Sequence, residues 1–352
     1  MNNLQKLISI TLITLAASIF AKESGVSFYH KNWMTVCDNT LTCRVAGYSK
    51  QAGTGGSVLF TRQAGANSTT TGEVLLAEDD PDKGTAAKKL ALWIDGKSKG
   101  DLIAEENKKW RLSEQQALAL IDAVKGSGKV EFKGGEQPFL LSSDGAYAAL
   151  LKADDVQGRI GTPGAWVKKG AKPESDVAAA IPTPVITAVA VSKAQSRVLD
   201  KSEADALRPR LLAISSGATD CDYLNIVGEE DFNGNIINGE ITVTPLDKTH
   251  TLISTLCWRA AYNEGYGFWL TDNTLNEKPV LVTEEAREYH NGIISNVFLG
   301  RSTGDCMTKE EWVWNGKTFQ QSLAMTTGIC WYLRPGGDWT IPSLVTDVKH
   351  KD

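Results

Sequence analysis

Short runs of alternating apolar and polar residues recur along the first half of the chain and predict β-strands. β-branched and aromatic residues are enriched in residues 27–37, 56–63, 72–79 and 88–96, and Gly or Asn residues bound these runs. A strand with one face in a core shows this period of two, because successive side chains point to opposite faces. The first half is therefore expected to contain a β-sandwich-like arrangement of strands.

Two stretches of the first half have the helical period instead. A helix is expected from Ser113 to Gly126, because Ser113 and Gln116 fit a capping box and Gly126 can end the helix. A second helix is expected over residues 143–155. The predicted inward-facing positions of the two helices are Leu118, Ile121, Val124, Tyr147, Leu150 and Leu151.

The second half begins with a predicted helix over residues 202–214, which Pro209 is expected to shorten. Beyond it the pattern is almost entirely strand and turn. The expected strands cover residues 240–246, 251–258, 265–272, 278–285, 291–300 and 310–324. Asn315 and Gly316 are typical of a tight hairpin turn. Strands without intervening helices favour an antiparallel sheet and argue against a doubly wound nucleotide-binding fold.

A change of composition separates these two halves. Residues 170–184 are rich in Ala, Pro and small polar residues and lack an amphipathic pattern, which is typical of a linker. The sequence therefore predicts an α+β protein of two domains. Residues 22–169 form the domain with two helices, and residues 185–352 form a mainly antiparallel β domain.

Residues 1–21 are predicted to be a secretory signal peptide. Lys6 precedes a short apolar run, and Ala21 is the expected cleavage point, with cleavage after Ser18 as the second choice. An uncleaved membrane anchor is the alternative, but the run is short for a bilayer span, which needs about 20 residues. The mature chain is therefore expected to be periplasmic and to have no stable membrane anchor.

Six cysteines follow the predicted signal peptide, and an even number in an exported chain favours disulfides. The simplest pairing by proximity along the chain is Cys37–Cys43, Cys221–Cys257 and Cys306–Cys330. No C-x-x-C occurs, so a structural zinc site is disfavoured. The 37 Lys and Arg residues against 42 Asp and Glu residues give a net charge of −5, which argues against a nucleic-acid partner.

The stretch EEDFNGNIINGE, residues 229–240, resembles the twelve-residue calcium loop of an EF-hand, because oxygen-bearing side chains recur at alternate positions. The candidate Ca²⁺ ligands are Glu229, Asp231, Asn233, Asn235 and Glu240. Gly234 falls at the sharp turn of such a loop. Three features count against calcium: Glu occupies the first position, Ile237 offers no side-chain oxygen, and a strand follows where a helix is usual. The favoured alternative is a polar turn.

Aromatic residues crowd the second half and could form the floor of a groove for a glycan or a peptide. The candidate surface residues are Trp258, Tyr262, Tyr266, Trp269, Trp312 and Trp314. The alternative, which is favoured, is that these large side chains fill the core of a thin β domain.

The residues from Gly300 to Gly304 satisfy G-x-S-x-G, the pattern that holds the nucleophile of many hydrolases. Ser302 would be that nucleophile. However, Cys306 follows closely, no helix is expected after the motif, and only His350 lies beyond it. The sequence therefore assigns no catalytic residue, and a glycine-bearing turn beside a disulfide is the favoured interpretation.

Five phrases occur in an order that resembles a bacterial periplasmic family, domain of unknown function 1176. The phrases are NWMTVCDNTLTCRVAGY, DVQGRIGTPGAWVKKG, LCWRAAYN, GRSTGDC and DWTIPSLVTDV. The resemblance extends over essentially the whole mature chain. The first half also resembles, more weakly, the invasion-associated locus B proteins, which share the Trp-x-x-x-Cys opening seen at Trp33 and Cys37. The family resemblance implies a periplasmic protein of a Gram-negative bacterium and implies no reaction.

The sequence thus favours an exported, disulfide-stabilised binding or envelope-interaction module that is not an enzyme. Its expected partner is an unidentified envelope protein or glycan. The alternatives are a hydrolase acting on the cell envelope or on glycans, and a calcium-stabilised structural module.

Overall fold

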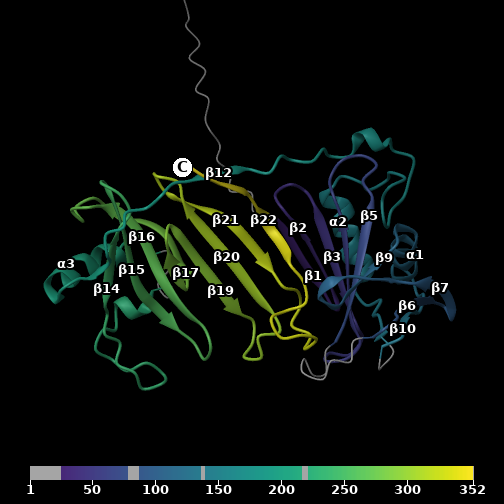
Figure 1. The fold of residues 1–352 in the computed structure, drawn as a ribbon, viewed down its shortest axis with the longest axis horizontal. Coiled ribbons are helices and arrows are strands. Elements are labelled where there is room, and N and C mark those ends of the chain that lie inside the picture. Colours follow the sequence, from purple (N-terminus) through teal and green to yellow (C-terminus); the bar gives the residue numbers. More distant parts are fainter. Residues whose placement is uncertain (1–24, 78–86, 136–138, 216–220, 352) are drawn as a thin grey trace, which may run out of the picture.

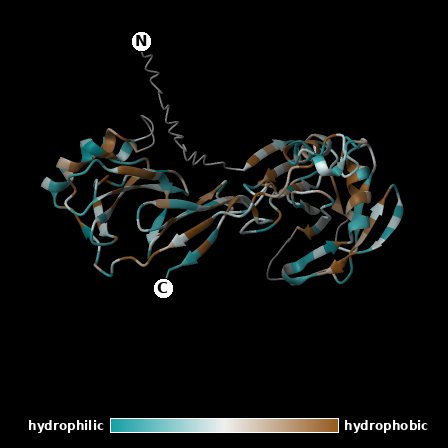
Figure 2. Ribbon diagram, turned by 90° about the horizontal axis from the view of Figure 1, so that it is seen from above, coloured by the Kyte–Doolittle hydropathy of each residue, from teal (hydrophilic) through white to brown (hydrophobic). Residues whose placement is uncertain are grey.

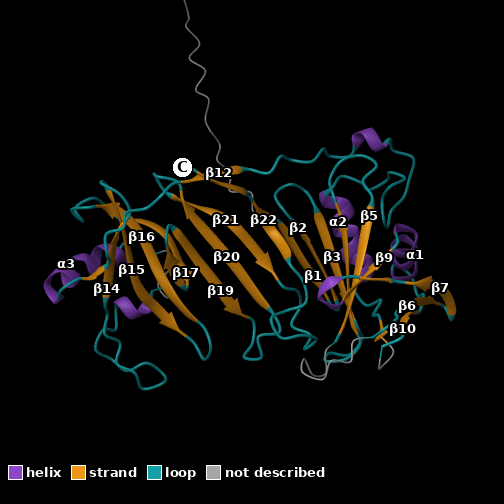
Figure 3. Cartoon of the chain, viewed as in Figure 1, coloured by secondary structure: helices purple, strands orange, loops and turns teal. Residues whose placement is uncertain are grey.

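The computed structural model describes residues 25–77, 87–135, 139–215 and 221–351. The predicted signal peptide lies outside these residues. The molecule is elongated and mainly β, with several antiparallel sheets along its length and helices at both ends (Figures 1 and 3). Apolar and polar residues are interspersed along the strands of both halves (Figure 2). Among the described residues, no helix is both long enough and apolar enough to cross a membrane.

The first half is built around a seven-stranded antiparallel sheet. Its order is β1 (Val26–His30), β2 (Trp33–Cys37), β3 (Cys43–Tyr48), β4 (Gly56–Arg62), β5 (Thr70–Leu76), β9 (Lys109–Leu112) and β8 (Ile103–Ala104). Short connections and the period-two alternation explain this meander, because each consecutive strand can pair with the one before it. The 3₁₀ helix η1 (Glu106–Lys108) lies between β8 and β9.

A smaller sheet and two helices cover one face of this sheet. The sheet contains β11 (Phe139–Leu140), β10 (Val130–Lys133), β6 (Ala91–Ile94) and β7 (Lys97–Asp101), and the helices are α1 (Glu114–Val124) and α2 (Ala146–Val156). Both predicted helices are confirmed, and Ser113 and Gln116 form the expected capping box. Leu118 and Tyr147 are exposed rather than inward, because the adjacent turns of each helix make the core contacts.

The second half contains α3 (Lys201–Leu212) and two five-stranded antiparallel sheets. The first sheet contains β13 (Arg197–Val198), β14 (Ile241–Pro245), β15 (His250–Arg259), β16 (Glu264–Asp272) and β17 (Val280–Ala286). The second contains β18 (Glu288–His290), β19 (Ile293–Leu299), β20 (Met307–Trp314), β21 (Phe319–Thr326) and β22 (Ile341–Val345). The strand-rich second half is therefore confirmed. Pro209 lies inside α3, which continues to Leu212.

Two cores stabilise the second half, one on each face of the β13–β17 sheet. Leu207 and Leu211 of α3 pack against Trp269 and neighbouring apolar residues on one face. On the other face, Leu252 and Phe268 meet residues of the β18–β22 sheet. Burial of these apolar side chains is the main source of stability, at about 25 cal/mol per Å² removed from water.

Between the halves, residues 170–184 have little regular structure apart from the 3₁₀ helix η2 (Glu174–Asp176). The chain then forms β12 (Val185–Ala188), which pairs in parallel with the last strand, β23 (Asp347–His350). A third core joins the halves, because Leu333, Trp339 and Ile341 pack against the face of the seven-stranded sheet that carries Met34 and Leu59. The division into domains at residues 170–184 stays a prediction.

All three expected disulfides are present: Cys37–Cys43, Cys221–Cys257 and Cys306–Cys330. Each closes a loop between elements that also pair through the backbone or share a core. Three disulfides indicate that the chain folds in an oxidising compartment.

Candidate functional site

The predicted calcium loop is a compact hairpin that its own aspartate holds together. The Oδ1 atom of Asp231 accepts hydrogen bonds from the backbone N–H groups of Asn233 and Asn235, at 2.9 Å each. Glu230 and Ile236 form a single antiparallel bridge across the turn. Arg259 of β15 anchors the hairpin to the sheet, because its Nη1 atom lies 3.1 Å from Asp231 Oδ2. These contacts are those of a polar turn.

Among the other candidate calcium ligands, the side chain of Asn235 contacts Asp231, but its amide Nδ2 donates to both carboxylate oxygens at 3.2 Å, which is the contact of a turn and not of an ion site. Glu229, Asn233, Asn235 and Glu240 are exposed, whereas Asp231 is buried. Glu240 Oε2 instead accepts a hydrogen bond of 2.7 Å from Asn238 Nδ2. A calcium ion needs six to eight oxygens around one centre. The geometry therefore favours the turn over a calcium site at residues 229–240.

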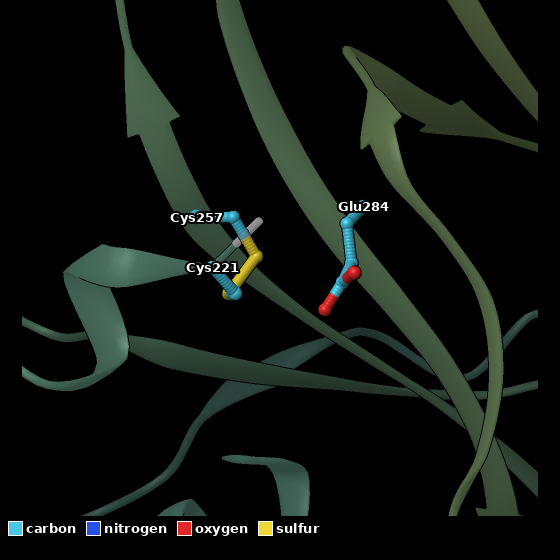
Figure 4. A group of neighbouring side chains, drawn as sticks. All are labelled: Cys221, Cys257 and Glu284. Carbon is cyan, nitrogen blue, oxygen red and sulfur yellow. A yellow bond between two sulfur atoms is a disulfide. The ribbon is translucent and has the colours of Figure 1, made fainter. Parts of the chain in front are cut away.

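Within the described part of the chain, one group of three His, Cys, Asp or Glu side chains is close enough to hold a metal: Cys221, Cys257 and Glu284 (Figure 4). The two cysteines form a disulfide, so neither sulfur is a thiolate, the form that binds metals. Glu284 is buried and accepts a hydrogen bond from the Ser215 hydroxyl. In the oxidised protein this group is therefore structural.

A polar cleft with a volume of about 410 Å³ opens beside the hairpin, on the sheet formed by β14, β15 and β16. The residues that contribute its polar groups are Tyr223, Asp231, Asn238, Glu240, Thr242, Ser254, Arg259 and Tyr266. Tyr223 belongs to the short 3₁₀ helix η3 (Asp222–Leu224), which the Cys221–Cys257 disulfide fixes to β15. Three strands, one hairpin and one disulfide therefore position the cleft.

The strand register explains why the floor of the cleft is polar. Ser254 lies opposite Thr242 on one side and Phe268 on the other, so these residues share a face of the sheet. The same face carries Leu252, which packs in the core between the two sheets. Beyond that core, Thr242 and Ser254 replace apolar side chains with hydroxyl groups. The floor of the cleft therefore lies on the same sheet face as the core between the two sheets, at a place where the second sheet does not cover it.

Arg259, the cationic side chain that lines the cleft, is paired within the protein. Arg259 pairs with Asp231 at 3.1 Å and with Glu264 Oε2 at 3.3 Å. Partial burial acts to lower the pKa of Arg259, but the hydrogen bonds to Asp231 and Glu264 outweigh it and raise this pKa overall. Burial also raises the pKa values of Tyr223 and Tyr266, so both phenols keep their protons. The cleft therefore presents hydroxyl groups, one paired cation and the exposed carboxylate of Glu240.

The structure divides the predicted aromatic surface. Trp269 and Trp314 are fully buried and Trp312 is 7% exposed, so these three fill cores and cannot contact a ligand. Tyr266 lines the cleft, and Tyr262 is 43% exposed. Trp258 is half-buried, and its indole N–H donates to the Glu284 carbonyl at 3.2 Å. Packing in the core explains most of the tryptophans, as the alternative interpretation expected.

Ser302 lies exposed in the turn between β19 and β20. The segment that follows it is the strand β20, so the strand–turn–helix geometry that activates a hydrolase serine is not formed. His350 lies on the exposed strand β23. The Gly300 to Gly304 motif is therefore a turn next to the Cys306–Cys330 disulfide.

Sequence reasoning reached part of the cleft and missed part. Asp231, Glu240 and Tyr266 were candidates for calcium or for an aromatic groove, and the structure brings all three to one cleft. It missed Thr242 and Ser254, although a usable signal existed for Ser254. Ser254 lies between Leu252 and Leu256, at a strand position where the alternation would place a core residue, whereas Thr242 follows the polar positions of its own strand.

The fold is that of a mainly β protein with three disulfides, which indicate an oxidising compartment. A family model described as "Protein of unknown function (DUF1176)" matches residues 27–346, so the chain belongs to this family. The chain is also similar to the "Uncharacterized protein YpfG" of Escherichia coli (strain K12), with 24% identity over 328 residues that cover 82% of this chain and 84% of that protein. No solved structure matches the chain.

Proposed function

We propose that this protein is a periplasmic binding module whose cleft beside residues 229–240 takes a neutral glycan. The cleft with its hydroxyl-lined floor is the observation that carries this proposal. The three disulfides support a location outside the cytoplasm, because they require an oxidising compartment. The predicted signal peptide and the family membership are consistent with that location.

The polar groups of the cleft decide the ligand class. Hydroxyl groups from Thr242, Ser254 and the two tyrosines can both donate and accept hydrogen bonds, which suits a sugar. Arg259 is already paired with two carboxylates, so it offers little to an anionic ligand. The volume of about 410 Å³ falls in the range of small-ligand sites, roughly 300–1,000 Å³. A neutral polyhydroxylated ligand therefore fits better than a phosphate or a carboxylate.

The hairpin beside the cleft favours an envelope protein as a second candidate partner. Phe232 and Ile236 are 62% and 60% exposed. They lie on a hairpin whose backbone is held by hydrogen bonds within the hairpin. Apolar side chains that lie together at a surface form a patch to which a protein partner can bind. Since Ile236 also lines the cleft, a protein partner and a glycan would meet the same region.

Thermal melts with chitotriose, cellotriose and maltotriose test the glycan proposal. A saccharide at 100 times its Kd stabilises the folded protein by about 2.7 kcal/mol, which raises the Tm by several degrees. We expect Ser254→Trp to abolish the rise, because the indole fills the floor of the cleft. Thr308→Trp, which adds the same side chain at an exposed position of β20, is the matched control.

Binding that survives in the Ser254→Trp variant would show that the saccharide sits elsewhere. If no saccharide raises the Tm, the glycan proposal fails. A protein partner would instead be supported if the Phe232→Ser and Ile236→Ser variants no longer captured a purified envelope protein while the Ser254→Trp variant still did.

A further inference from the structure

The segment that joins β21 to β22, residues 327–340, docks the second half on the first. Its Trp339 donates an indole hydrogen bond of 2.8 Å to Ser57 Oγ of β4, and the backbone N–H of Ile329 donates to the Tyr48 hydroxyl at 3.0 Å. Trp331 donates to the Ser49 carbonyl at 3.2 Å. These residues are separated by about 280 positions in the chain, so the segment fixes the relative position of distant strands.

Two further features show how closely this docking segment fits. Arg334 reaches across to the first half and donates to the carbonyls of Leu76 and Lys108, at 3.1 Å each. Gly328 has a φ of 117°, and a Cβ atom there would collide with the Tyr48 hydroxyl. Few side-chain alternatives are therefore compatible with the docked arrangement.

Asp338 is buried at this junction without any hydrogen bond to its carboxyl group. The residue is 6% exposed, and neither Oδ1 nor Oδ2 has a hydrogen-bond partner among the described residues. Its backbone N–H donates to the Thr327 carbonyl at 3.3 Å, which holds it in the docking segment next to Trp339. An ionised carboxylate without donors is costly in such a place, whereas the neutral acid is tolerated much better.

The charged and titratable groups around Asp338 come from three elements. Arg334 lies in the docking segment, Asp305 in the turn between β19 and β20, and Tyr48 on β3. Burial raises the pKa of Asp338 to about 8, with Asp305 adding to the rise and Arg334 opposing it. Asp305 is itself satisfied, because it accepts from Thr303 and from the Tyr332 backbone and pairs with Arg301.

We propose that the docking of residues 327–340 on the seven-stranded sheet is proton-controlled: the contact is closed while Asp338 is protonated and loosens when Asp338 ionises. The ionised carboxylate gains hydration only by leaving the interface, so it favours the undocked arrangement. A protein outside the cytoplasm experiences the pH of its surroundings directly. The same chain would therefore hold its halves more tightly in acidic than in alkaline surroundings.

The direction of the effect follows from proton linkage. The pKa of Asp338 is higher in the docked state, at about 8, than its ordinary value of 3.8, so the docked state binds more protons between these values. Docking is therefore strongest below about pH 4 and weakens as the pH rises towards 8. Transfer of one proton changes the docking equilibrium by up to tenfold per pH unit.

Hydrogen–deuterium exchange at pH 5.5, 6.5 and 7.5, corrected for the intrinsic exchange rate, tests this proposal on the full chain. As the pH rises, we expect the protection of residues 327–341 and of the facing strands β3 and β4 to fall in the wild type. The expected decrease is up to tenfold per pH unit. Asp338→Asn, which cannot ionise, should show a flat profile. Asp347→Asn, which removes an exposed carboxylate from strand β23, should behave as the wild type does.

The same pH profile in the wild type and in Asp338→Asn would overturn the proposal. A direct measurement covers the case in which this variant does not fold. The ¹³C carboxyl resonance of Asp338 in the wild type should titrate with a midpoint near 8. A midpoint near the ordinary value of about 4 would show that the carboxyl group is hydrated, and the proposal would then be wrong.

Discussion

Asp154 in the first half and Asp338 at the junction are both buried aspartates, yet their surroundings differ completely. Asp154 is 0% exposed, and both of its oxygens are occupied. Oδ1 accepts from Arg62 Nη2 at 2.7 Å and from the Trp166 backbone at 3.0 Å, and Oδ2 accepts from the Val167 backbone at 2.9 Å. Within the described part of the chain, the carboxyl group of Asp338 has no such partner.

The cation that faces Asp154 is equally well satisfied. Arg62 also donates to Gln157 Oε1 at 2.7 Å and to the Gly164 carbonyl at 3.1 Å, and it stacks on the Trp166 ring at 3.7 Å. Burial lowers the pKa of Arg62 to about 10, with Asp154 opposing this change, so the guanidinium stays charged at neutral pH. This network joins α2, β4 and the loop before the predicted linker.

The contrast shows how hydrogen-bond partners decide whether a buried carboxyl group keeps one charge state or changes it with pH. A buried ion with every hydrogen bond made rigidifies its surroundings and fixes one structure. A buried ionisable group without partners is a place where protonation alters stability. The buried aspartate of the first half therefore has a structural role, whereas the buried aspartate at the junction can respond to pH.

The largest expected effect is on the satisfied pair. Asp154→Ala should lower the free energy of unfolding by about 3–5 kcal/mol, because it leaves the Arg62 guanidinium buried without its counter-charge. Urea unfolding measures this loss. Asp155→Ala is the matched control, since Asp155 is an exposed neighbour on the same helix that pairs with Lys152 at the surface. We expect the control to change stability by less than about 1 kcal/mol.

Equal losses for the two variants would show that the buried network contributes no more than a surface pair. The contrast between Asp154 and Asp338 would then lose its physical basis, because complete hydrogen bonding would no longer distinguish the two sites.

The disulfides extend the comparison from charges to covalent links. Cys37–Cys43 in the first half closes a separation of 6 residues, and Cys221–Cys257 in the second closes one of 36. Chain entropy gives stabilisations of about 2.2 and about 3.8 kcal/mol for these two loops. We therefore expect the double Cys→Ala variant of the second pair to unfold at lower urea concentration than that of the first.

The Cys221–Cys257 variant should also weaken any saccharide binding, because this disulfide fixes Tyr223 beside the cleft. A variant that loses stability but binds saccharide as the wild type does would show that the disulfide does not contribute to the binding site. A larger loss for the Cys37–Cys43 variant would mean that local packing outweighs loop length.

A third expectation concerns the pH dependence of Asp338 itself. As the pH rises from 4 to 8, the wild type should lose unfolding free energy relative to Asp338→Asn. The expected loss is up to about 1.4 kcal/mol per pH unit. The sign follows because the raised pKa of Asp338 makes the wild type lose stability as the pH rises through this window. Thermal melts of both proteins across the window measure it. Parallel pH profiles would contradict it.

Much of the fold could be predicted from the sequence because its causes are local. The capping box at Ser113, the strand alternation and the disulfide between nearby cysteines depend on neighbours in the chain, and the structure confirms them. The difference between Asp154 and Asp338 could not be predicted. The partners of Asp154 include Arg62, which lies 92 residues away, and the interface around Asp338 forms only when strands about 280 residues apart meet.

The candidate site shows the same division between local and distant causes. The sequence of residues 229–240 favoured a turn, because Glu229 and Ile237 fit a calcium loop poorly and a strand follows, and the hydrogen bonds of Asp231 in the structure are those of a turn. The cleft itself depends on the register of β14, β15 and β16, which places Thr242 beside Ser254. Trp269 and Trp314 were candidates for the surface because composition cannot distinguish a buried aromatic residue from an exposed one.

The smallest expected effect concerns Asp231, a third aspartate that resembles Asp154 more than Asp338. Hydrogen bonds, first of all the one from the Asn235 backbone N–H, lower the pKa of Asp231, and Arg259 completes its partners. This aspartate should therefore stabilise the fold above its ordinary pKa and lose that contribution in acid, the opposite direction to Asp338. Because its oxygens are already occupied, millimolar calcium should leave the Tm unchanged relative to EGTA, with magnesium as the control. A calcium-specific rise that Glu240→Gln removes would show that the hairpin exchanges Arg259 for an ion. In that case Asp231 would be a second responsive aspartate, and complete hydrogen bonding would not be enough to make a buried carboxylate purely architectural.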